Sequence, residues 1–372
     1  MTSAGSVALV HDWLNQLGGA EDVLECLAGM FPTAPIHTSM YWRARMPAAY
    51  RAWPVRVSFM DRLPGIYRQH QPYLPLYPLA FERFNLSQFE VVLSNKSGFC
   101  HGVRPAPGAR HVCYCLSPTR YVWDFDAYAG HEGLGLGVRL AMGPLLGWLR
   151  RWDYAAAQRV DQFIAISTEV QQRIQRFYGR ESVIIHPPVD TARFKLAEAQ
   201  PLSGDYYLSL GRLIPYKRVD LAVQACTRLK LPLLVGGEGR DRARLERMAG
   251  PTVKFLGRVP EADMPALMAG CRAFIFPGLE DFGIAPVQAL AAGRPVIALA
   301  GGGALDIVQD GVNGVLFPQP NVDGLCAAIE RFERLAFDPP AQRRSAEHFD
   351  RARFEEQLRA FLLEPRSPYG TP

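Results

Sequence analysis

The sequence lacks the patterns that mark several broad classes of protein. No apolar run approaches the roughly 20 residues needed to cross a bilayer, and the short polar lead before VALVHDWL at Val7 leads us to expect no signal peptide. The 7 cysteines form no Cys-x-x-Cys pair and mostly lie in apolar runs, which fits structural thiols in a reducing compartment. No basic run is interleaved with aromatic residues, so we expect no nucleic-acid partner. We therefore expect a folded, cytoplasmic protein.

What the sequence does contain is enough apolar residues for more than one core. It has 372 residues, of which 48% are apolar and 21% charged, and this length suggests two domains. The net charge of +5 mildly favours anionic ligands or an anionic membrane surface.

Apolar, β-rich segments alternate with helical patterns in two series. The first series has segments at residues 6, 89, 110, 160 and 181; the second, after the segment KLAEAQPLSGD, has them at residues 206, 231, 252, 272 and 294. This alternation predicts an α/β fold of two Rossmann-like, doubly wound domains that face a central cleft, with ligands at the carboxyl ends of the strands. The expected domains span residues 1–190 and 203–340, and residues 341–372 are expected to form a tail and a helix that crosses back toward the first domain.

Two segments break this alternation. Residues 40–85 are rich in Pro, Tyr, Arg and Trp, and residues 133–153, GLGLGVRLAMGPLLGWLRRWD, are apolar with several arginines. The second segment has two interpretations. It is either a helix packed against its own sheet or an interfacial surface on anionic lipid, with arginines at the headgroups and tryptophans at the boundary: Arg139, Arg150, Arg151, Trp148 and Trp152.

The segment FPGLEDFGIAPVQALAAGRPVIA, residues 276–298, combines a helix start with an unusual set of polar residues. Its pattern predicts Pro286 at the first helical position, Gly293 at the helix end and a buried strand at residues 296–299. Glu280 and Gln288 are not explained by this helix and strand. Because free backbone N–H groups at a helix N-terminus attract anions, the pattern predicts an anion site.

The segment GRLIPYKRVD supplies cations that would suit such an anion. Gly211 turns the chain after a strand, and Arg212 and Lys217 follow at the strand end. Arg212 offers a planar, two-pronged donor and Lys217 a point charge, which together would neutralise a diphosphate.

These motifs, with VGGEGRDRARLE and VKFLGRV between them, resemble the donor-binding half of a retaining GT-B glycosyltransferase. More narrowly, the chain resembles the family 4 mannosyltransferases of bacterial polysaccharide assembly. HDWLNQLGGAEDVLE and HVCYCLSPTRYVWD are similar to first-domain motifs of that subgroup, so the resemblance covers nearly the whole chain.

The resemblance implies roles for residues of the second domain. Glu280 contacts hydroxyls of the donor sugar, and Arg212 and Lys217 hold the diphosphate as the catalytic cations. Gln288 stands where the family usually has a glutamate that binds ribose hydroxyls, a change that weakens donor binding by roughly 1 to 2 kcal/mol. The other donor-binding residues implied are Gly18, Gly19, Gly211, Phe255, Phe282, Gly283 and Ile284.

The first domain is expected to carry the acceptor side. Leu116 stands where relatives commonly have a histidine, which removes a possible proton carrier. The acceptor-side residues implied by the family pattern and by sequence proximity are Glu21, His111, Arg120, Tyr121, Trp123 and Asp124. The Asp-Phe-Asp sequence at residues 124–126 looks like a metal-binding motif of another glycosyltransferase fold. It follows RYVW in the first domain, however, whereas the donor diphosphate is expected in the second. We therefore expect no metal and no cofactor.

The function implied is transfer of a hexose to a hydroxyl group. We expect GDP-mannose as the donor and, as the acceptor, a polysaccharide or a glycan on a polyprenyl diphosphate, at the inner face of the cell membrane. Three alternatives stay open: a UDP-sugar-dependent glycosyltransferase, a nucleotide-sugar 2-epimerase and a non-catalytic nucleotide-sugar-binding subunit.

Overall fold

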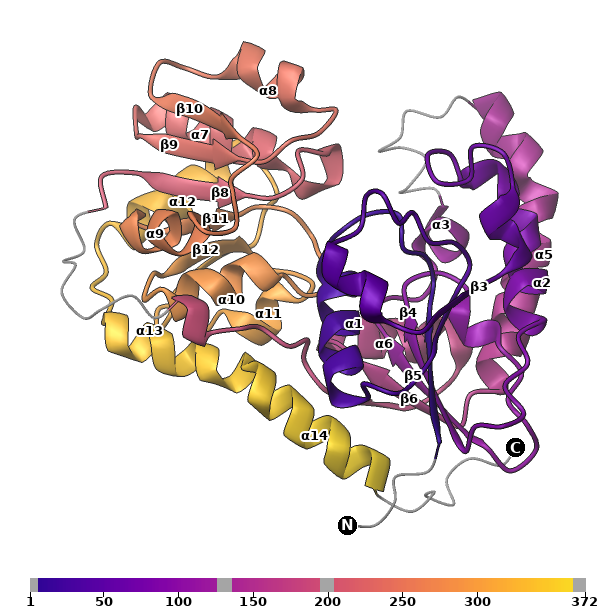
Figure 1. Ribbon diagram of the computed structural model, residues 1–372. Coiled ribbons are helices and arrows are strands. Elements are labelled where there is room, and N and C mark those ends of the chain that lie inside the picture. Colours follow the sequence, from indigo (N-terminus) through magenta and orange to yellow (C-terminus); the bar gives the residue numbers. More distant parts are fainter. Residues whose placement is uncertain (1–5, 126–135, 195–203, 364–372) are drawn as a thin grey trace. The chain divides into compact units, whose positions relative to one another are not determined.

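The computed structural model describes residues 6–125, 136–194 and 204–363. Its contacts divide the chain into two units (Figure 1). The first unit comprises Met1–His186 and Glu355–Pro372, and the second comprises Pro187–Phe354. Each unit contains one parallel sheet with helices packed against it, so the predicted α/β fold is confirmed.

The sheet of the first unit has the strand order β3-β2-β1-β4-β5-β6-β7, and every pairing is parallel. The order reverses between β1 and β4, where His11 lies opposite Asn95. The strands are β1 (Val7–His11), β2 (Ile36–Thr38), β3 (Val55–Val57), β4 (Val91–Lys96), β5 (Arg110–Cys115), β6 (Gln162–Ala165) and β7 (Ser182–Ile184). The helices are α1 (Gly19–Met30), α2 (Tyr77–Glu82), α3 (Arg120–Trp123), α5 (Leu136–Gln158) and α6 (Thr168–Tyr178), with short 3-10 turns that include η4 (Cys100–Gly102).

The sheet of the second unit has the order β10-β9-β8-β11-β12-β13, again all parallel, and reverses between β8 and β11. Its strands are β8 (Tyr207–Leu210), β9 (Leu233–Gly236), β10 (Val253–Gly257), β11 (Phe274–Phe276), β12 (Val296–Leu299) and β13 (Gly314–Phe317). Its helices are α7 (Val219–Leu229), α8 (Arg242–Met248), α9 (Met264–Gly270), α10 (Ile284–Ala291), α11 (Ala304–Ile307), α12 (Val322–Phe332) and α13 (Pro339–Ala346), with 3-10 turns that include η6 (Pro215–Lys217). Helix α14 (Arg351–Leu363) spans the division between the units at Phe354 and Glu355.

Local sequence explains why these elements form. Strand β12 (VIAL) is apolar and buried throughout, because helices cover both faces of a parallel sheet. Helix α6 begins where the Ser167 hydroxyl accepts a hydrogen bond from Val170 N, and it ends at Gly179, whose φ of 63° few other residues adopt. Asn321 caps α12 in the same way through Gly324 N.

Each predicted strand is present, but three strands were not predicted: β2, β3 and β13. One helix start also differs from the prediction. Helix α10 begins at Ile284, so Pro286 is its third residue rather than its first. Pro286 still lies in the first turn, where a missing backbone N–H breaks no bond within the helix.

Helix α5 has one packed face and one exposed face, and contact of the exposed face with lipid stays a prediction. Trp152 packs inward, donating from Nε1 to Glu82 at 2.9 Å, whereas the side chains of Trp148 and Tyr154 are 46% and 47% exposed. Residues 133–135 and the Arg139 side chain lie outside the described part of the chain. Within the described residues, no helix is both long enough and apolar enough to span a membrane.

Candidate active site

The loops that follow β8 and β11 carry an ion pair across the point where the strand order reverses. Lys217 Nζ donates to Glu280 Oε1 at 2.7 Å and to Oε2 at 2.8 Å. The two side chains are 18% and 19% exposed, so a ligand can reach both. Open parallel sheets bind ligands at this reversal, at the carboxyl ends of the strands. The Lys217–Glu280 pair therefore marks the candidate site of the second unit.

Glycines let the two loops approach closely enough to form this pair. A Cβ atom at Gly278 would lie only 2.8 Å from Lys217 Cα, which no larger residue tolerates without a shift of the backbone. The Lys217 side chain also crosses Gly211, where a Cβ would lie 3.4 Å from Nζ and φ is 151°. Packing against the Lys217 backbone therefore requires Gly278, whereas the positive φ favours glycine at position 211.

The backbone of Glu280 is fixed by the turn after β12. Its carbonyl accepts a hydrogen bond from Gly303 N at 2.9 Å. A Cβ at Gly302, where φ is 60°, would lie 2.3 Å from that carbonyl oxygen. Loops from three neighbouring strands thus place the Glu280 carboxylate.

Helix α10 begins directly beyond Glu280. Its N-cap is Gly283, with φ 111° and no side-chain cap, so its first N–H groups are not satisfied by a capping side chain. Phe282 packs inward against Phe349, with ring centroids 5.6 Å apart, so only its backbone is suited to ligand contact. Ile284 and Gln288 are half-buried on the helix.

The remaining predicted donor residues of the second unit lie on the neighbouring loops. Arg212 is exposed, and among the described residues its guanidinium contacts Tyr216 Oη at 3.5 Å. Phe255 is half-buried in β10. The turns after β8, β9 and β10 are joined by backbone bonds from Gly211 N to Gly236 O and from Gly237 N to Gly257 O.

In the first unit, Gly18 and Gly19 form the exposed start of α1, as predicted for a strand-to-helix turn. Glu21 is buried at the start of α1. Its side chain is 3% exposed, and Oε1 lies 3.4 Å from His11 Nε2. Glu21 therefore contacts the end of β1 inside the first unit, and its role on the acceptor side stays a prediction.

His111 is likewise not on a surface. It is the second residue of β5, 1% exposed, with Nε2 3.0 Å from Ser94 Oγ. Burial, and to a lesser degree the charge of Arg159, lower the pKa of His111 to about 3. A neutral imidazole inside the sheet suits a structural role, and the contact of His111 with an acceptor stays a prediction.

The other predicted acceptor-side residues lie on and next to α3. Trp123 donates from Nε1 to Asp153 Oδ2 at 2.6 Å and stacks on Phe177. Arg120 and Tyr121 are half-buried, and Asp124 is exposed at the helix end.

Sequence reasoning missed Asp12, which joins β1 to β4 at the reversal of the first sheet. Its buried carboxylate accepts hydrogen bonds from the backbone N–H groups of the segment after β4: Ser97 at 2.6 Å, Gly98 at 2.6 Å, Phe99 at 2.6 Å and Cys100 at 2.8 Å. An aspartate directly after a buried strand, with Ser-Gly after another, was the available signal. Without the strand order, nothing in the sequence connects them.

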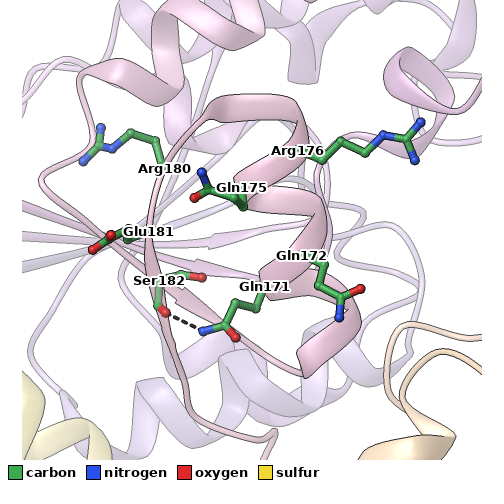
Figure 2. A pocket seen from close by; sticks show the side chains of 7 residues that line it. All are labelled: Gln171, Gln172, Gln175, Arg176, Arg180, Glu181 and Ser182. Carbon is green, nitrogen blue, oxygen red and sulfur yellow. Dashed lines mark hydrogen bonds between the residues drawn. The ribbon is translucent and has the colours of Figure 1, made fainter.

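A surface cavity of about 570 Å³ lies on the first unit between α6 and β7 (Figure 2). Gln171 donates to the Ser182 carbonyl at 2.6 Å across it, and Arg180 binds the carbonyls of Ala157 and Asp161. Its cations and amides are thus partly used within the fold, and none of the predicted site residues lines it.

Two known families match the chain and together span residues 17–348. Residues 17–193 match the family described as Glycosyltransferase Family 4, and residues 191–348 match Glycosyl transferases group 1. The chain belongs to the GT-B glycosyltransferases. Within this GT-B glycosyltransferase, the Lys217–Glu280 pair lies in the group 1 region.

Relatives of this GT-B glycosyltransferase differ in their named activities. A glycogen synthase of Mycobacterium tuberculosis is 32% identical over 203 residues, which cover 50% of this chain and 48% of the relative. A GDP-mannose-dependent alpha-mannosyltransferase of Mycolicibacterium smegmatis is 31% identical over 235 residues, covering 59% and 58%. The chain thus spans about half the length of the curated relatives it matches.

Solved structures agree on the fold. Anabaena HepE in complex with UDP-glucose has a TM-score of 0.68 at 20% identity, covering 96% of this chain and 99% of that one. At this identity the likeness establishes the arrangement of strands and helices and no more.

Proposed function

We propose that this protein is a retaining glycosyltransferase that moves mannose from GDP-mannose to a hydroxyl group of a glycan acceptor. The Lys217–Glu280 pair carries the proposal, because it holds a cation and a sugar-binding carboxylate together at the reversal of the second sheet. The N-terminus of α10 lies next to it in the chain. A nucleoside diphosphate sugar needs these groups together.

The proposed reaction makes a bond between the acceptor oxygen and the anomeric carbon and breaks the bond from that carbon to the diphosphate. Negative charge grows on the leaving diphosphate, and Lys217, Arg212 and the α10 N–H groups stabilise it. The acceptor proton passes to a phosphate oxygen, so no side chain is needed as the base. We propose that these groups act without a metal ion.

The donor sugar is proposed as mannose because of the sequence motifs and the mannosyltransferase relative from Mycolicibacterium. A UDP-sugar is the second candidate, favoured by the UDP-glucose complex of HepE. Glu280 suits either donor because it contacts the sugar. Residues near Phe255 would distinguish the bases.

The acceptor is proposed as a polyprenyl-diphosphate-linked or polysaccharide glycan, bound by the first unit at an anionic membrane surface. The exposed face of α5 supports membrane contact, since it presents Trp148 and Tyr154 with Arg151. Aromatic and cationic side chains on one helix face suit the headgroup region of a bilayer.

Calorimetry tests the donor directly. GDP, UDP, GDP-mannose and UDP-glucose are titrated into the wild type, into Glu280→Ala and into Glu330→Ala, an exposed glutamate on α12 that serves as the control. We expect guanine ligands to bind preferentially, and Glu280→Ala to weaken GDP-mannose about tenfold while GDP keeps its affinity, which is roughly the loss of a charge-assisted hydrogen bond.

Other outcomes point to the alternatives. Preference for the uracil ligands would replace mannose by a UDP-linked sugar. Conversion of the donor to its epimer without an acceptor would indicate the 2-epimerase. Donor binding with neither transfer nor epimerisation would leave a non-catalytic subunit, and no nucleotide binding would refute the proposal.

A further inference from the structure

The predicted acceptor-side segment Leu116–Asp124 is hydrogen-bonded by side chains of β4 and α5 that the proposed chemistry does not use. The segment begins directly after β5 and contains α3. Lys96, the last residue of β4, donates from Nζ to the Ser117 carbonyl at 3.2 Å and to Thr119 Oγ1 at 3.2 Å. Arg150 of α5 donates from Nε to the Val122 carbonyl at 2.7 Å.

Asp153 of α5 makes further contacts with this segment and with neighbouring elements. Its Oδ2 accepts from Trp123 Nε1 at 2.6 Å and from Tyr178 Oη at 2.7 Å. Its Oδ1 lies 3.2 Å from Thr119 Oγ1 and 3.5 Å from His101 Nε2. One fully buried carboxylate therefore connects the segment after β5 to α6 and η4.

Lys96 and Asp153 both contact Thr119 Oγ1, so their charges lie close together. Burial raises the pKa of Asp153, and the charge of Lys96 opposes that shift. Lys96 is also fully buried; burial opposes its charge, but the attraction of Asp153 and neighbouring groups raises its pKa. Removing one member of such a pair leaves an uncompensated charge in the interior, whereas removing both does not. The pair can therefore be tested by charge-balanced variants.

We propose that Asp153 is a positioning residue for the acceptor: through Thr119 and Trp123 it sets the conformation of the segment Leu116–Asp124, and hence acceptor affinity, without contributing to donor binding. That the positioned segment binds an acceptor rests on the proposed function. The positioning itself rests on the three hydrogen bonds that a buried carboxylate accepts.

The first measurement needs no ligand. Amide hydrogen exchange of residues 117–124 is compared in the wild type, Asp153→Asn and Asp161→Asn. Asp161 is the matched control, since its carboxylate also accepts a hydrogen bond in the first unit, from His111 N at 2.7 Å, before β6. We expect at least tenfold faster exchange of residues 117–124 in Asp153→Asn only. Unchanged exchange would overturn the proposal whether or not the protein is an enzyme.

The second measurement separates affinity for the two substrates. With octyl α-mannoside as acceptor and GDP-mannose as donor, Asp153→Asn should raise the acceptor KM at least tenfold and leave the donor KM and the calorimetric donor affinity within twofold. Equal losses in both KM values would show a merely structural role. If the wild type binds no nucleotide, the proposed function fails while the exchange result still decides the positioning.

Two further variants allow for poor folding of Asp153→Asn. Trp123→Phe deletes only the Nε1–H bond and keeps an aromatic ring on Phe177, so we expect a threefold to tenfold rise in acceptor KM. The double variant Lys96→Met with Asp153→Asn should recover stability relative to Asp153→Asn but not acceptor KM. Recovery of both would overturn the positioning role.

Discussion

The two sheets reverse their strand order in the same way, but different groups join the strands at the two reversals. In the first unit the Asp12 carboxylate binds four backbone N–H groups and is fully buried. In the second unit the Lys217–Glu280 pair joins the loops and stays partly exposed. The buried hydrogen bonds of Asp12 at the first reversal stabilise the fold. The ion pair at the second reversal is accessible, so its charged groups can exchange their mutual contact for contacts with a ligand.

The histidines whose pKa is lowered by burial follow the same division. His37, His70, His101 and His111 all lie in the first unit, and burial lowers the pKa of each. The loops of the second unit depend instead on glycines and paired charges, such as Gly278 beside Lys217. The comparison predicts that substitutions at the second reversal affect activity, and that those at the first affect stability.

The largest effect is expected for Lys217→Ala. Loss of a preorganised donor to a developing oxyanion costs about 10² to 10³ in kcat, and Lys217 also holds Glu280. Initial-rate measurements of transfer from GDP-mannose test this, with Arg334→Ala as a control that removes an exposed cation from the same unit. Unimpaired transfer by Lys217→Ala would show that Lys217 does not act on the diphosphate.

A smaller effect, on stability, is expected for Asp12→Asn. The amide directs its NH2 group at backbone donors that now bind a carboxylate, and losing hydrogen bonds to a charged group costs about 3 kcal/mol. For a unit of this size the melting temperature should fall by roughly 6 to 12 °C, while nucleotide affinity stays the same.

Asp22→Asn is the control for Asp12, because Asp22 is exposed in the first turn of α1 and contributes less than about 1 kcal/mol there. Scanning calorimetry of both variants checks the difference. Equal melting temperatures in the two variants would mean that the Asp12 bonds do not stabilise the first unit.

Features that depend on neighbouring residues in the sequence could be predicted, whereas features that depend on contacts between distant segments could not. Apolar runs such as VIAL in β12 predicted strands correctly, because a buried parallel strand needs no alternation. The short strand β2 (IHT) was not predicted, because the polar residue His37 interrupts its apolar pattern. In the structure its ring is buried against Phe84 and Phe89.

The site was predicted in part for the same reason. Glycine and cation motifs placed Lys217 and Glu280 at strand ends, but their pairing depends on β11 lying beside β8, which no local pattern encodes. The burial of Glu21 and His111 also depends on tertiary neighbours, His11 and Ser94. The position of a polar residue near a motif therefore does not reveal whether its side chain is buried.

The titration of His111 should lower the free energy of unfolding by about 2 kcal/mol at acidic pH. The pKa of His111 is about 3 in the folded state and about 6.5 when unfolded, so below pH 6.5 only the unfolded state takes up the proton. Stability is therefore unaffected above that pH and falls as the pH decreases toward 3. From pH 7 to pH 5 the loss from His111 is about 2 kcal/mol.

Urea unfolding of the wild type and His111→Gln at both pH values measures this loss. The variant lacks the titrating group, so its stability should fall by about 2 kcal/mol less between pH 7 and pH 5. The same pH dependence in His111→Gln and the wild type would contradict the linkage.

The smallest effect is expected for Gln288→Glu, which should strengthen donor binding at the second reversal rather than weaken it. Gln288 is half-buried on α10, five residues into the helix that begins beyond Glu280. A carboxylate there would accept charge-assisted bonds from ribose hydroxyls, a gain of about 1 kcal/mol or roughly fivefold in donor affinity by calorimetry. Gln319→Glu, an exposed site with the same change in charge, controls for general repulsion of the diphosphate. If Gln288→Glu instead weakened GDP and GDP-mannose equally, the side chain would face the diphosphate and not the ribose.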